Sequence, residues 1–493
     1  MTLASRMNDS PPPPRIAPDM SRRRFLWDTG AGLSGVALAW LLQQEARAAN
    51  ASTPLPASPY APKPTRFAAK AKRVVHICAC GGVSHIDTFD YKPELEKRHG
   101  EELTSKGKID TFFGRPGRLM KSQFAFRRHG QSGLWMSDLL PHLATCVDEM
   151  TFLYGMHSKS SNHTPATFFM NTGFTMNGFP CLGAWLSYGL GSENQDLPAY
   201  VVLPDPRQLP AGGAINWTSG FLPAVHQGVA FRPGSEPITD LNTPAQITPA
   251  RRQAESALLA KLNQQFLDAN PSDTALAARL RSYELAARMQ LSVPEAVSFE
   301  AEGEATKRLY GLDQPATAGF GRNCLLARRL LEKGVRFVQL FHGGAFGSPR
   351  INWDGHEDLR DNHLKQAASM DQPVAALLKD LRARGLLDET LVLWTTEFGR
   401  TPITQGIGAP GRDHHPQGFT IWMAGAGLKP GYGHGATDEV GFFASEKKTQ
   451  VHDYLATVLH LLGIDHEHLT FYHNGIQRRL TDVHGEVVHD ILA

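Results

Sequence analysis

The feature that most constrains the fold is an alternation, in the second half of the chain, of helical patterns with short and almost uninterrupted apolar segments. Residues 322–334 have a helical pattern and lead into the apolar segment 335–342, and residues 367–385 lead in the same way into 390–399. A strand that is apolar along its whole length is buried on both faces, which is typical of a parallel sheet covered by helices. The chain is therefore predicted to be an α/β protein with a mainly parallel central sheet.

Further apolar segments extend this pattern. Residues 73–80, 152–158 and 199–204 each fit a buried strand, and the strand predicted at 419–425 is followed by a helical pattern at 451–464. Open sheets of this kind bind their ligands beyond the carboxyl ends of the strands. The residues that flank these strands are therefore the first candidates for a functional site.

The first 48 residues have the organisation of an export signal rather than of a folded domain. A twin arginine in SRRRFL, at 21–26, precedes the apolar run 31–42 and a small-residue exit at 46–48. This segment resembles a twin-arginine signal peptide, which would place the mature protein in the periplasm or outside the cell. The apolar run is shorter than the roughly 20 residues of a membrane-spanning helix, and an uncleaved amino-terminal anchor is the alternative.

The rest of the chain divides into a linker and one large domain. Residues 49–70 are rich in Pro and Ala and are predicted to form an extended linker. Residues 71–493 are predicted to form the α/β domain. Within it, the charged, Ala- and Leu-rich pattern of 248–291 predicts a helical insertion at about 245–295.

The composition argues against a nucleic-acid-binding protein and against a disulfide scaffold, and it favours a protein with a metal site or acid–base chemistry. The formal net charge is +2, so the chain lacks the basic excess of a nucleic-acid-binding protein. The five cysteines are odd in number and contain no CxxC pair, which argues against a disulfide scaffold and a catalytic cysteine. All 21 histidines follow residue 48, many of them in loop-like segments, and this enrichment favours a metal site or acid–base chemistry.

Polar side chains gather beside four of the predicted strands. Because the carboxyl ends of parallel strands lie at one edge of a sheet, these carboxylates and imidazoles are expected to share a pocket. Such ligands suit zinc, manganese or iron better than a soft metal, and two cations could clamp the attacking and leaving oxygens of a phosphate or sulfate ester. The candidate metal ligands are His85, Asp87, Asp354, His356, Glu397, His414 and His415.

Two arginines and a further histidine are candidates for contacting the substrate. Arg400 follows the strand predicted at 390–399, and Arg412 precedes the one at 419–425. A guanidinium at either position could make bidentate contacts to an anionic group, although a surface ion pair is the alternative for both. His363 lies in the same region of the sequence and is a further candidate for substrate binding.

The segment 81–93, GGVSHIDTFDYKP, has two interpretations. It brings His85 and Asp87 directly after a buried strand, which suits a metal ligand or a substrate contact. Alternatively, the segment is a capped turn whose hydroxyl groups bond to the backbone and whose Asp90 pairs with Lys92.

Several motifs resemble the alkaline phosphatase and sulfatase superfamily. LVLWTTEFGR, from residue 391, resembles its motif of a strand that ends in an acidic residue, and VHDYLATVLHLLGID, from 451, resembles the terminal helix of sulfatases. HTPATFFMNTGF, from 163, resembles the segment around the sulfatase nucleophile. More closely, GGVSHIDTFDYKP, WDGH, EFGRTP, GRDHHPQGFT and LTDVHGEVV together resemble the DUF1501 branch, in matching order from about residue 73 to the end.

The resemblance implies a fold and a cofactor. The fold is a three-layer, alkaline-phosphatase-like sandwich with a mainly parallel central sheet. The cofactor is one or two divalent metal ions, with zinc, manganese, iron and calcium as the candidates. By the same resemblance, Glu397 is a ligand or a base in place of the usual Asp, and Arg400 holds the anion.

The chain departs from the sulfatase pattern at the nucleophile. When Pro165 is placed on the sulfatase proline, His163 stands at the position of the nucleophilic Cys or Ser, which excludes a formylglycine mechanism. The resemblance implies that His163 takes the attack position, or that the hydroxyl of Ser161 or Thr164 serves instead.

The chain also departs from the sulfatase pattern at positions that bind the metal ions. Phe398 stands where a ligand His or Asn is common, which weakens one metal site. Gly81 and Gly82 stand where sulfatases carry an acidic pair, and His85 and Asp87 are the nearest substitutes.

Together these features predict an exported, metal-dependent hydrolase of sulfate or phosphate esters. Its substrate would be a small molecule or a polysaccharide, and its expected protein partner is the twin-arginine export machinery. A non-catalytic binding or scaffold protein that keeps the fold is the alternative, favoured by Phe398 and by the missing nucleophile. A mutase or transferase on the same fold has the same sequence features as a hydrolase, and the oligomeric state stays open.

Overall fold

The structure is a computed structural model that describes most of the chain from Tyr60 to Ala493. The predicted signal peptide and most of the predicted linker lie outside the described residues. Short internal segments also lie outside them: residues 105, 108, 110, 113–114, 233–236, 239–247, 271–279, 281–284, 286–287, 290–292, 347–349 and 407.

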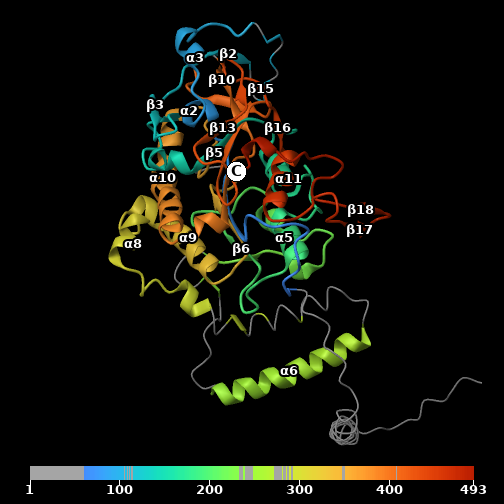
Figure 1. Cartoon of the computed structure of the whole chain (residues 1–493). Coiled ribbons are helices and arrows are strands. Elements are labelled where there is room, and N and C mark those ends of the chain that lie inside the picture. Colours follow the sequence, from blue (N-terminus) through green and yellow to red (C-terminus); the bar gives the residue numbers. More distant parts are fainter. Residues whose placement is uncertain are drawn as a thin grey trace, which may run out of the picture. The chain divides into compact units, whose positions relative to one another are not determined.

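A nine-stranded sheet forms the centre of the fold (Figure 1). Its strands follow the order β13-β5-β12-β9-β1-β8-β6-β7, and β16 also pairs with β5. The strands are β1 (Arg73–Ala79), β5 (Met150–His157), β6 (Tyr200–Leu203), β7 (Val229–Ala230), β8 (Phe337–His342), β9 (Thr390–Thr395), β12 (Phe419–Gly425), β13 (Tyr432–His434) and β16 (Thr449–Gln450).

Only one strand of this described sheet runs against its neighbours. Strand β12 pairs antiparallel with both β5 and β9, whereas the other pairs in the sheet are parallel. The prediction of a mainly parallel sheet is confirmed. Its central strands are apolar because helices cover both faces, which leaves no face for polar side chains.

Helices cover the sheet on two sides (Figure 1). Along β1 the side chains alternate: Val75 and Ile77 belong to a core with α9 and α10, whereas Val74 and Cys78 belong to a second core with α5 and α11. The larger helices are α4 (His163–Thr172), α5 (Leu182–Leu190), α6 (Pro249–Ala269), α9 (Pro315–Glu332), α10 (Leu359–Ala383) and α11 (Val451–Leu461). The three-layer α/β prediction is therefore confirmed.

A small three-stranded sheet lies apart from the central one. It has the order β11-β10-β2, with β2 at Pro116–Leu119, β10 at Gly399–Gln405 and β11 at Arg412–His415. Strands β10 and β11 pair antiparallel, with Arg400 opposite His414. The sequence analysis did not predict this hairpin, and it matters for the site because β11 carries His414 and His415.

The other described α-helices and strands are short, and five 3-10 helices lie between them: η1 (Leu143–Glu149), η2 (Gly213–Trp217), η3 (Ala224–His226), η4 (Leu387–Glu389) and η5 (His489–Ile491). The short α-helices and strands are α2 (His85–Thr88), α3 (Pro93–Lys97), α8 (Glu304–Leu309), β3 (Phe126–His129), β4 (Leu134–Ser137), β14 (Ala436–Thr437), β15 (Ala444–Glu446), β17 (Phe471–His473) and β18 (Ile476–Arg478). Helix α6 falls within the predicted insertion at about 245–295, most of whose remainder lies outside the described residues.

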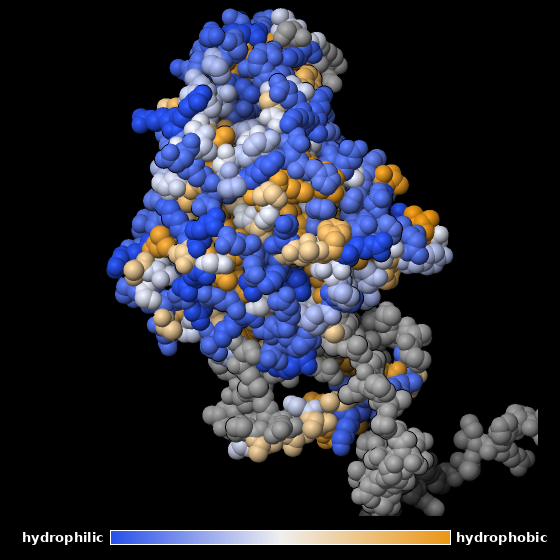
Figure 2. All heavy atoms as spheres, viewed as in Figure 1, coloured by the Kyte–Doolittle hydropathy of each residue, from blue (hydrophilic) through white to orange (hydrophobic). Residues whose placement is uncertain are grey.

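The surface agrees with the burial of apolar residues in these two cores. The face shown in Figure 2 is mostly hydrophilic, and its hydrophobic residues gather mainly near the middle. Within the described residues, none of the helices combines the length and the apolar character needed to cross a membrane.

Candidate metal centre

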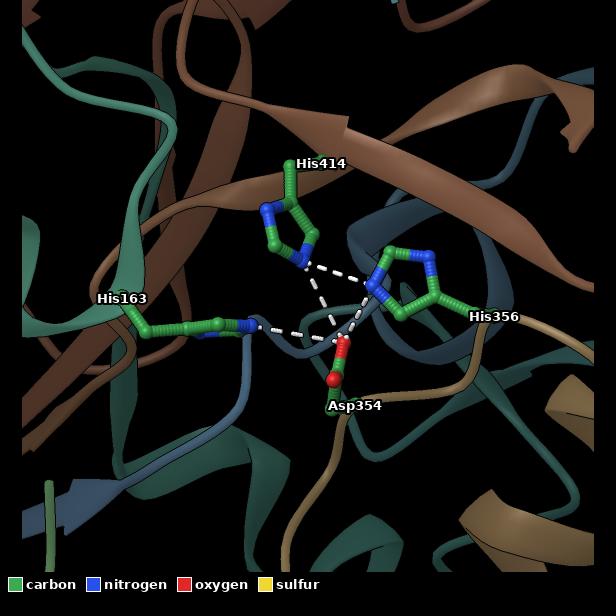
Figure 3. A group of neighbouring side chains, drawn as sticks. All are labelled: His163, Asp354, His356 and His414. Carbon is green, nitrogen blue, oxygen red and sulfur yellow. Dashed lines mark hydrogen bonds and ion pairs between the residues drawn. The ribbon is translucent and has the colours of Figure 1, made fainter. Parts of the chain in front are cut away.

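Four side chains from distant parts of the sequence meet at one point. The side chains of His163, Asp354, His356 and His414 each offer one ligand atom, and these atoms all lie within 4.8 Å of one another. Figure 3 shows the three imidazole rings around the carboxylate of Asp354. All four residues are buried, so their polar atoms must be satisfied inside the protein. We call them the histidine–aspartate cluster.

The topology of the sheet explains why these residues meet. His163 is the first residue of α4, soon after the end of β5, and Asp354 and His356 follow the end of β8. His414 instead precedes β12. Because β12 is antiparallel, its first residues lie at the same edge of the sheet as the last residues of the parallel strands.

The distances within the cluster centre on one oxygen. Asp354 Oδ1 lies 2.8 Å from His356 Nε2 and 3.3 Å from the Nε2 atoms of both His163 and His414. The Nε2 atoms of His356 and His414 are 2.8 Å apart. One carboxylate oxygen therefore faces the Nε2 atoms of three imidazole rings.

The other nitrogen of each ring is bound to an acceptor. His163 Nδ1 donates to Glu397 Oε1 at 2.6 Å, and His414 Nδ1 donates to the backbone carbonyl of Ser161 at 2.7 Å. His356 Nδ1 donates to the side-chain oxygen of Gln405. Because carboxylates and carbonyls only accept, Nδ1 carries the proton in the neutral form of a ring bound in this way, and the Nε2 atoms point into the cluster.

Three imidazole nitrogens around one carboxylate form a ligand set that suits a divalent metal ion. Burial lowers the pKa of His414 to about 3, so this ring is neutral at pH 7 and brings no proton on Nε2. The Nε2 atom of His163 is buried and has no well-formed hydrogen bond within the described part of the chain. Both observations are what a metal-binding arrangement of imidazoles produces.

The carboxylate that binds His163 is itself held in place. Glu397 Oε1 also accepts the backbone N–H of Gly81 at 2.9 Å, and Thr396 Oγ1 donates to Glu397 Oε2 at 3.3 Å. Glu397 therefore orients the imidazole of His163 from behind, as carboxylates do for many metal-bound histidines. The cluster does not include Glu397 as one of its four ligands.

Arg400 is a buried cation beside the cluster. Its side chain is fully buried, and its Nη2 donates to Asp354 Oδ1 at 2.6 Å. The remaining donors are also engaged: Nε donates to the carbonyl of Gly82 at 2.7 Å, Nη1 to that of Arg412 at 3.1 Å, and Nη2 to that of Gly81. The guanidinium therefore fixes Asp354 rather than presenting a free fork to an anion.

The pKa of Asp354 lies well below its ordinary value. Burial by itself raises the pKa of this carboxyl group, but the neighbouring positive charge of Arg400 is the largest of the interactions that outweigh burial and lower the pKa. Asp354 is therefore an anion throughout the physiological pH range, as a metal ligand must be.

Aromatic rings surround the cluster. Phe346 stacks on His163, with ring centroids 3.8 Å apart, and Phe398 lies 4.8 Å from His163 and 4.7 Å from His414. Phe112 lies 4.7 Å from His414. This apolar shell limits the access of water and strengthens the electrostatic interactions inside it.

Glycines permit the close backbone contacts around Asp354. Gly81 has a φ of +118°, and a Cβ there would lie 2.4 Å from the backbone nitrogen of Trp353. A Cβ on Gly411 would lie 1.8 Å from the carbonyl oxygen of His356. Any larger residue at either position would displace the segment that carries Asp354 and His356.

Asp87 and Arg412 were predicted to bind metal and substrate, and the structure places them elsewhere. Their side chains form a fully buried ion pair, with Arg412 Nε 2.7 Å from Asp87 Oδ2. Asp87 also accepts the hydroxyl of Ser84 at 2.5 Å and the backbone N–H of Gln123 at 2.9 Å. Both side chains are engaged in contacts within the protein, and neither belongs to the cluster.

Three predicted histidines also lie outside the cluster. His85 Nε2 lies 2.9 Å from the carbonyl of Gly441, and His415 Nε2 contacts the carbonyl of Phe442. His363 Nε2 accepts the backbone N–H of Ser84 at 3.2 Å. In each of these rings, Nε2 contacts a backbone group. The expectation that they bind metal or substrate therefore does not match the geometry.

The segment 81–93 follows the second of its two interpretations. The hydroxyl of Thr88 donates to the carbonyl of Ser84 at 2.7 Å, and Lys92 Nζ lies 2.9 Å from Asp90 Oδ1. This is a turn held by its own side chains. Its contribution to the site is made by backbone groups, through the carbonyls of Gly81 and Gly82.

The hairpin of β10 and β11 decides which of the two adjacent histidines reaches the cluster. Successive side chains of a strand point to opposite faces, so His414 and His415 cannot bind the same ion. His414 points to Asp354, whereas the ring of His415 lies 4.1 Å from that of Phe442. The three partners of the Nδ1 atoms were not foreseen, and one of them, the carbonyl of Ser161, leaves no signal in a sequence.

The fold and the cluster define a class: a three-layer α/β protein with a buried, histidine-rich candidate metal centre at the carboxyl edge of its sheet. The chain belongs to the family described as "Protein of unknown function (DUF1501)", whose model matches residues 71–492. No curated protein matches the chain.

Solved structures similar to the chain have low sequence identity to it. PsFucS1 sulfatase from Pseudoalteromonas sp. is 12% identical over 82% of this chain and 70% of that chain, with a TM-score of 0.32. The phosphonate monoester hydrolase SpPMH from Silicibacter pomeroyi is 13% identical over 66% and 68%, with a TM-score of 0.30. A protein in the alkaline phosphatase superfamily from Vibrio parahaemolyticus is 12% identical over 83% and 70%, with a TM-score of 0.32.

Proposed function

We propose that this protein is an exported, metal-dependent hydrolase of sulfate or phosphate esters. The observation that carries the metal site is the convergence of three Nε2 lone pairs on one carboxylate, each fixed by an acceptor on Nδ1. The class of reaction is supported by the superfamily motifs around residues 163, 397 and 451. Export is supported by the twin-arginine pattern at 21–26.

The residues of the cluster fit a divalent metal ion. Four tetrahedral ligands at a metal–nitrogen distance of about 2.0 Å lie about 3.3 Å from one another. Asp354 Oδ1 is 3.3 Å from the Nε2 atoms of His163 and His414, and the two contacts of His356 Nε2, at 2.8 Å, would lengthen by about 0.5 Å. Three nitrogens and one oxygen favour zinc, manganese or iron over calcium, which prefers oxygen ligands.

In this proposal, His163, Asp354, His356 and His414 would hold the metal ion, which would supply Lewis-acid activation of the ester and of the attacking group. His163 is then a ligand rather than the nucleophile, because Glu397 fixes its Nδ1 and its Nε2 points into the cluster. The hydroxyls of Ser161 and Thr164 flank His163 and stay as candidate nucleophiles.

The protein also provides a favourable environment for an anion. The Ser161 carbonyl contacts His414, so the amino end of α4 lies beside the centre. The positive end of the helix dipole favours a negatively charged group there. Phe112, Phe346 and Phe398 limit the water around it.

A matched pair of variants tests the proposal. His414→Gln should lower the zinc or manganese content of the purified protein at least about tenfold and abolish the hydrolysis of 4-nitrophenyl sulfate or phosphate. His415→Gln, which changes the neighbouring residue on the opposite face of β11, should keep both. Elemental analysis and the ester assay check these outcomes, and equal metal content in the two variants would refute the centre.

A second candidate function is a non-catalytic protein with a structural metal ion. Four protein ligands close a tetrahedral site, whereas a catalytic ion keeps a position open, and the side chains of His414 and Asp354 are only 2% and 12% exposed. Metal content without turnover on a panel of aryl sulfates, phosphates and phosphodiesters would favour this candidate. Loss of turnover together with metal in His414→Gln would favour the hydrolase.

A further inference from the structure

The three phenylalanine rings around the cluster differ in how deeply they are buried. Phe398 is fully buried, Phe346 is half-buried, and Phe112 is 41% exposed. The centroid of the Phe112 ring lies 4.7 Å from that of His414, with an angle of 31° between the two rings. The Phe112 ring therefore contacts a member of the cluster on one side and solvent on another, and it is the outermost of the three.

The backbone of Phe112 is tied to the strand that carries His414. The N–H of Phe112 donates to Asp413 Oδ2 at 2.6 Å, and Asp413 Oδ1 accepts the backbone N–H of His414 at 2.9 Å. Asp413 is itself buried, so water competes little for these two hydrogen bonds. The main chain at Phe112 is thus held beside the cluster, and the ring is the part that can turn.

The ligand atoms of the cluster lie behind other side chains. All four cluster residues are buried, so a metal ion or an ester has to pass a group that moves aside. A fully buried ring such as Phe398 is held by close packing, whereas an exposed side chain changes its rotamer within nanoseconds. Of the three rings, Phe112 is therefore the one that can uncover the cluster with the least disturbance of the packing.

We infer that the Phe112 ring controls access to the cluster: it covers His414 in this structure, and its rotation opens a path to the ligand atoms. The inference rests on the proposed function for the species that pass, a metal ion and an ester. A movable cover lets a site with buried ligands admit a substrate. A ring that only blocks the path slows entry and exit alike, so it leaves the equilibrium affinity unchanged.

The exchange rate of the metal ion is the first test. Release is measured by mixing the full chain, loaded with Zn²⁺, with an excess of a chelating dye, and uptake by mixing the metal-free chain with Zn²⁺. Phe112→Ala should raise both rates at least about tenfold and keep the dissociation constant within about threefold of wild type, because no ligand changes. Phe112→Tyr, which keeps a ring at this position, should behave as the wild type does.

Phe443→Ala is the matched control. Phe443 is 39% exposed and lies 6.1 Å from the ring of His415, on the other face of β11, so its removal should leave both rates within about twofold of wild type. Unchanged rates in Phe112→Ala, or faster exchange in both variants alike, would overturn the inference but leave the metal centre intact. Faster release with unchanged uptake would also overturn it, because Phe112 would then support His414 rather than cover it.

A second measurement needs no metal ion. Diethyl pyrocarbonate acylates neutral imidazole nitrogens, and peptide mass spectrometry gives the rate of this reaction at His414 in the metal-free chain. The rate should rise at least about tenfold in Phe112→Ala and keep its wild-type value in Phe443→Ala. Equal rates in the wild type and Phe112→Ala would overturn the inference.

The two measurements together separate the inference from the proposed function. A chain that binds no Zn²⁺ but shows the expected acylation rates would refute the metal centre and support the role of Phe112 as a cover. Circular dichroism and thermal melting check that the variants fold, and Phe112→Leu, which has a smaller side chain and no ring, takes the place of Phe112→Ala if the latter does not.

Discussion

Two buried carboxylates at the same edge of the sheet, Asp87 and Asp354, differ in what surrounds them. Each pairs with a buried arginine, Asp87 with Arg412 and Asp354 with Arg400. Asp87 is otherwise contacted by a hydroxyl and a backbone N–H, whereas Asp354 is contacted by three imidazoles. The sequence gives no reason to treat them differently, since both follow an apolar strand.

The difference teaches how to separate a structural carboxylate from a ligand. The partners of Asp87 each bring their own hydrogen, so its two oxygens are satisfied and nothing remains to be bound. The imidazoles around Asp354 donate their Nδ1–H groups to acceptors behind them, and their Nε2 atoms face inward. Three imidazole nitrogens and one carboxylate oxygen gathered at one point form a ligand set that suits a divalent metal ion, and this gathering marks the candidate metal site.

The largest effect is expected when the satisfied pair is broken. Asp87→Asn should lower the free energy of unfolding by about 3–5 kcal/mol, because it leaves the buried charge of Arg412 without a partner. Metal content per folded chain should not change. Urea unfolding and elemental analysis measure the two quantities, and a loss of metal in the folded variant would contradict the distinction between the two carboxylates.

The same variant also tests the comparison through the pH dependence of folding stability. Burial raises the pKa of Asp87, but Arg412, Ser84 and the N–H of Gln123 together lower it below the ordinary value of 3.8. A lowered folded-state pKa contributes stability that is complete above the unfolded value and is lost as the pH falls below it. Asp87→Asn should therefore flatten the decline in stability below about pH 3.8.

A smaller effect, on metal rather than on folding, is expected within the cluster. His356→Gln should weaken zinc or manganese binding about a hundredfold, since four ligands share a binding free energy of about 12 kcal/mol. Stability without metal should change less than in Asp87→Asn, because no charge is left unpaired. Competition with a chelating dye measures the affinity. An affinity within threefold of wild type would remove His356 from the ligand set.

The smallest effect is expected for Glu397, which contacts the cluster residue His163 from behind. Glu397→Gln keeps the shape of the side chain but replaces the charged acceptor behind His163, and should weaken metal binding about tenfold. The same competition assay applies. A loss as large as that of His356→Gln would indicate that Glu397 binds the metal directly, as the sequence motif had suggested.

The fold was largely predictable from the sequence. The apolar segments at 335–342, 390–399 and 419–425 fit strands because a parallel sheet needs both faces apolar, and the structure has β8, β9 and β12 there. The direction of β12 was not foreseen, because a buried strand has the same composition whichever way it runs. That direction is what brings His414 to the correct edge.

The site was predictable only in part. Asp354 and His356 were found because they follow a buried strand, and His163 because of a motif resemblance. His414 and His415 were both predicted to be metal ligands, and only the pairing of β11 with β10 separates them. The role of Arg400 depends on carbonyl groups of Gly81 and Gly82, which every residue possesses.

The reversed direction of β12 has a consequence for how such a protein can diversify. The chain leaves β9 at this edge of the sheet, forms the β10–β11 hairpin and enters β12 from the same edge, so the hairpin brings His414 to the cluster without crossing the sheet. Insertions between β10 and β11 would therefore leave the strand order of the central sheet unchanged. In the proposed hydrolase, substrate specificity would change by this route while the metal ligands stay the same.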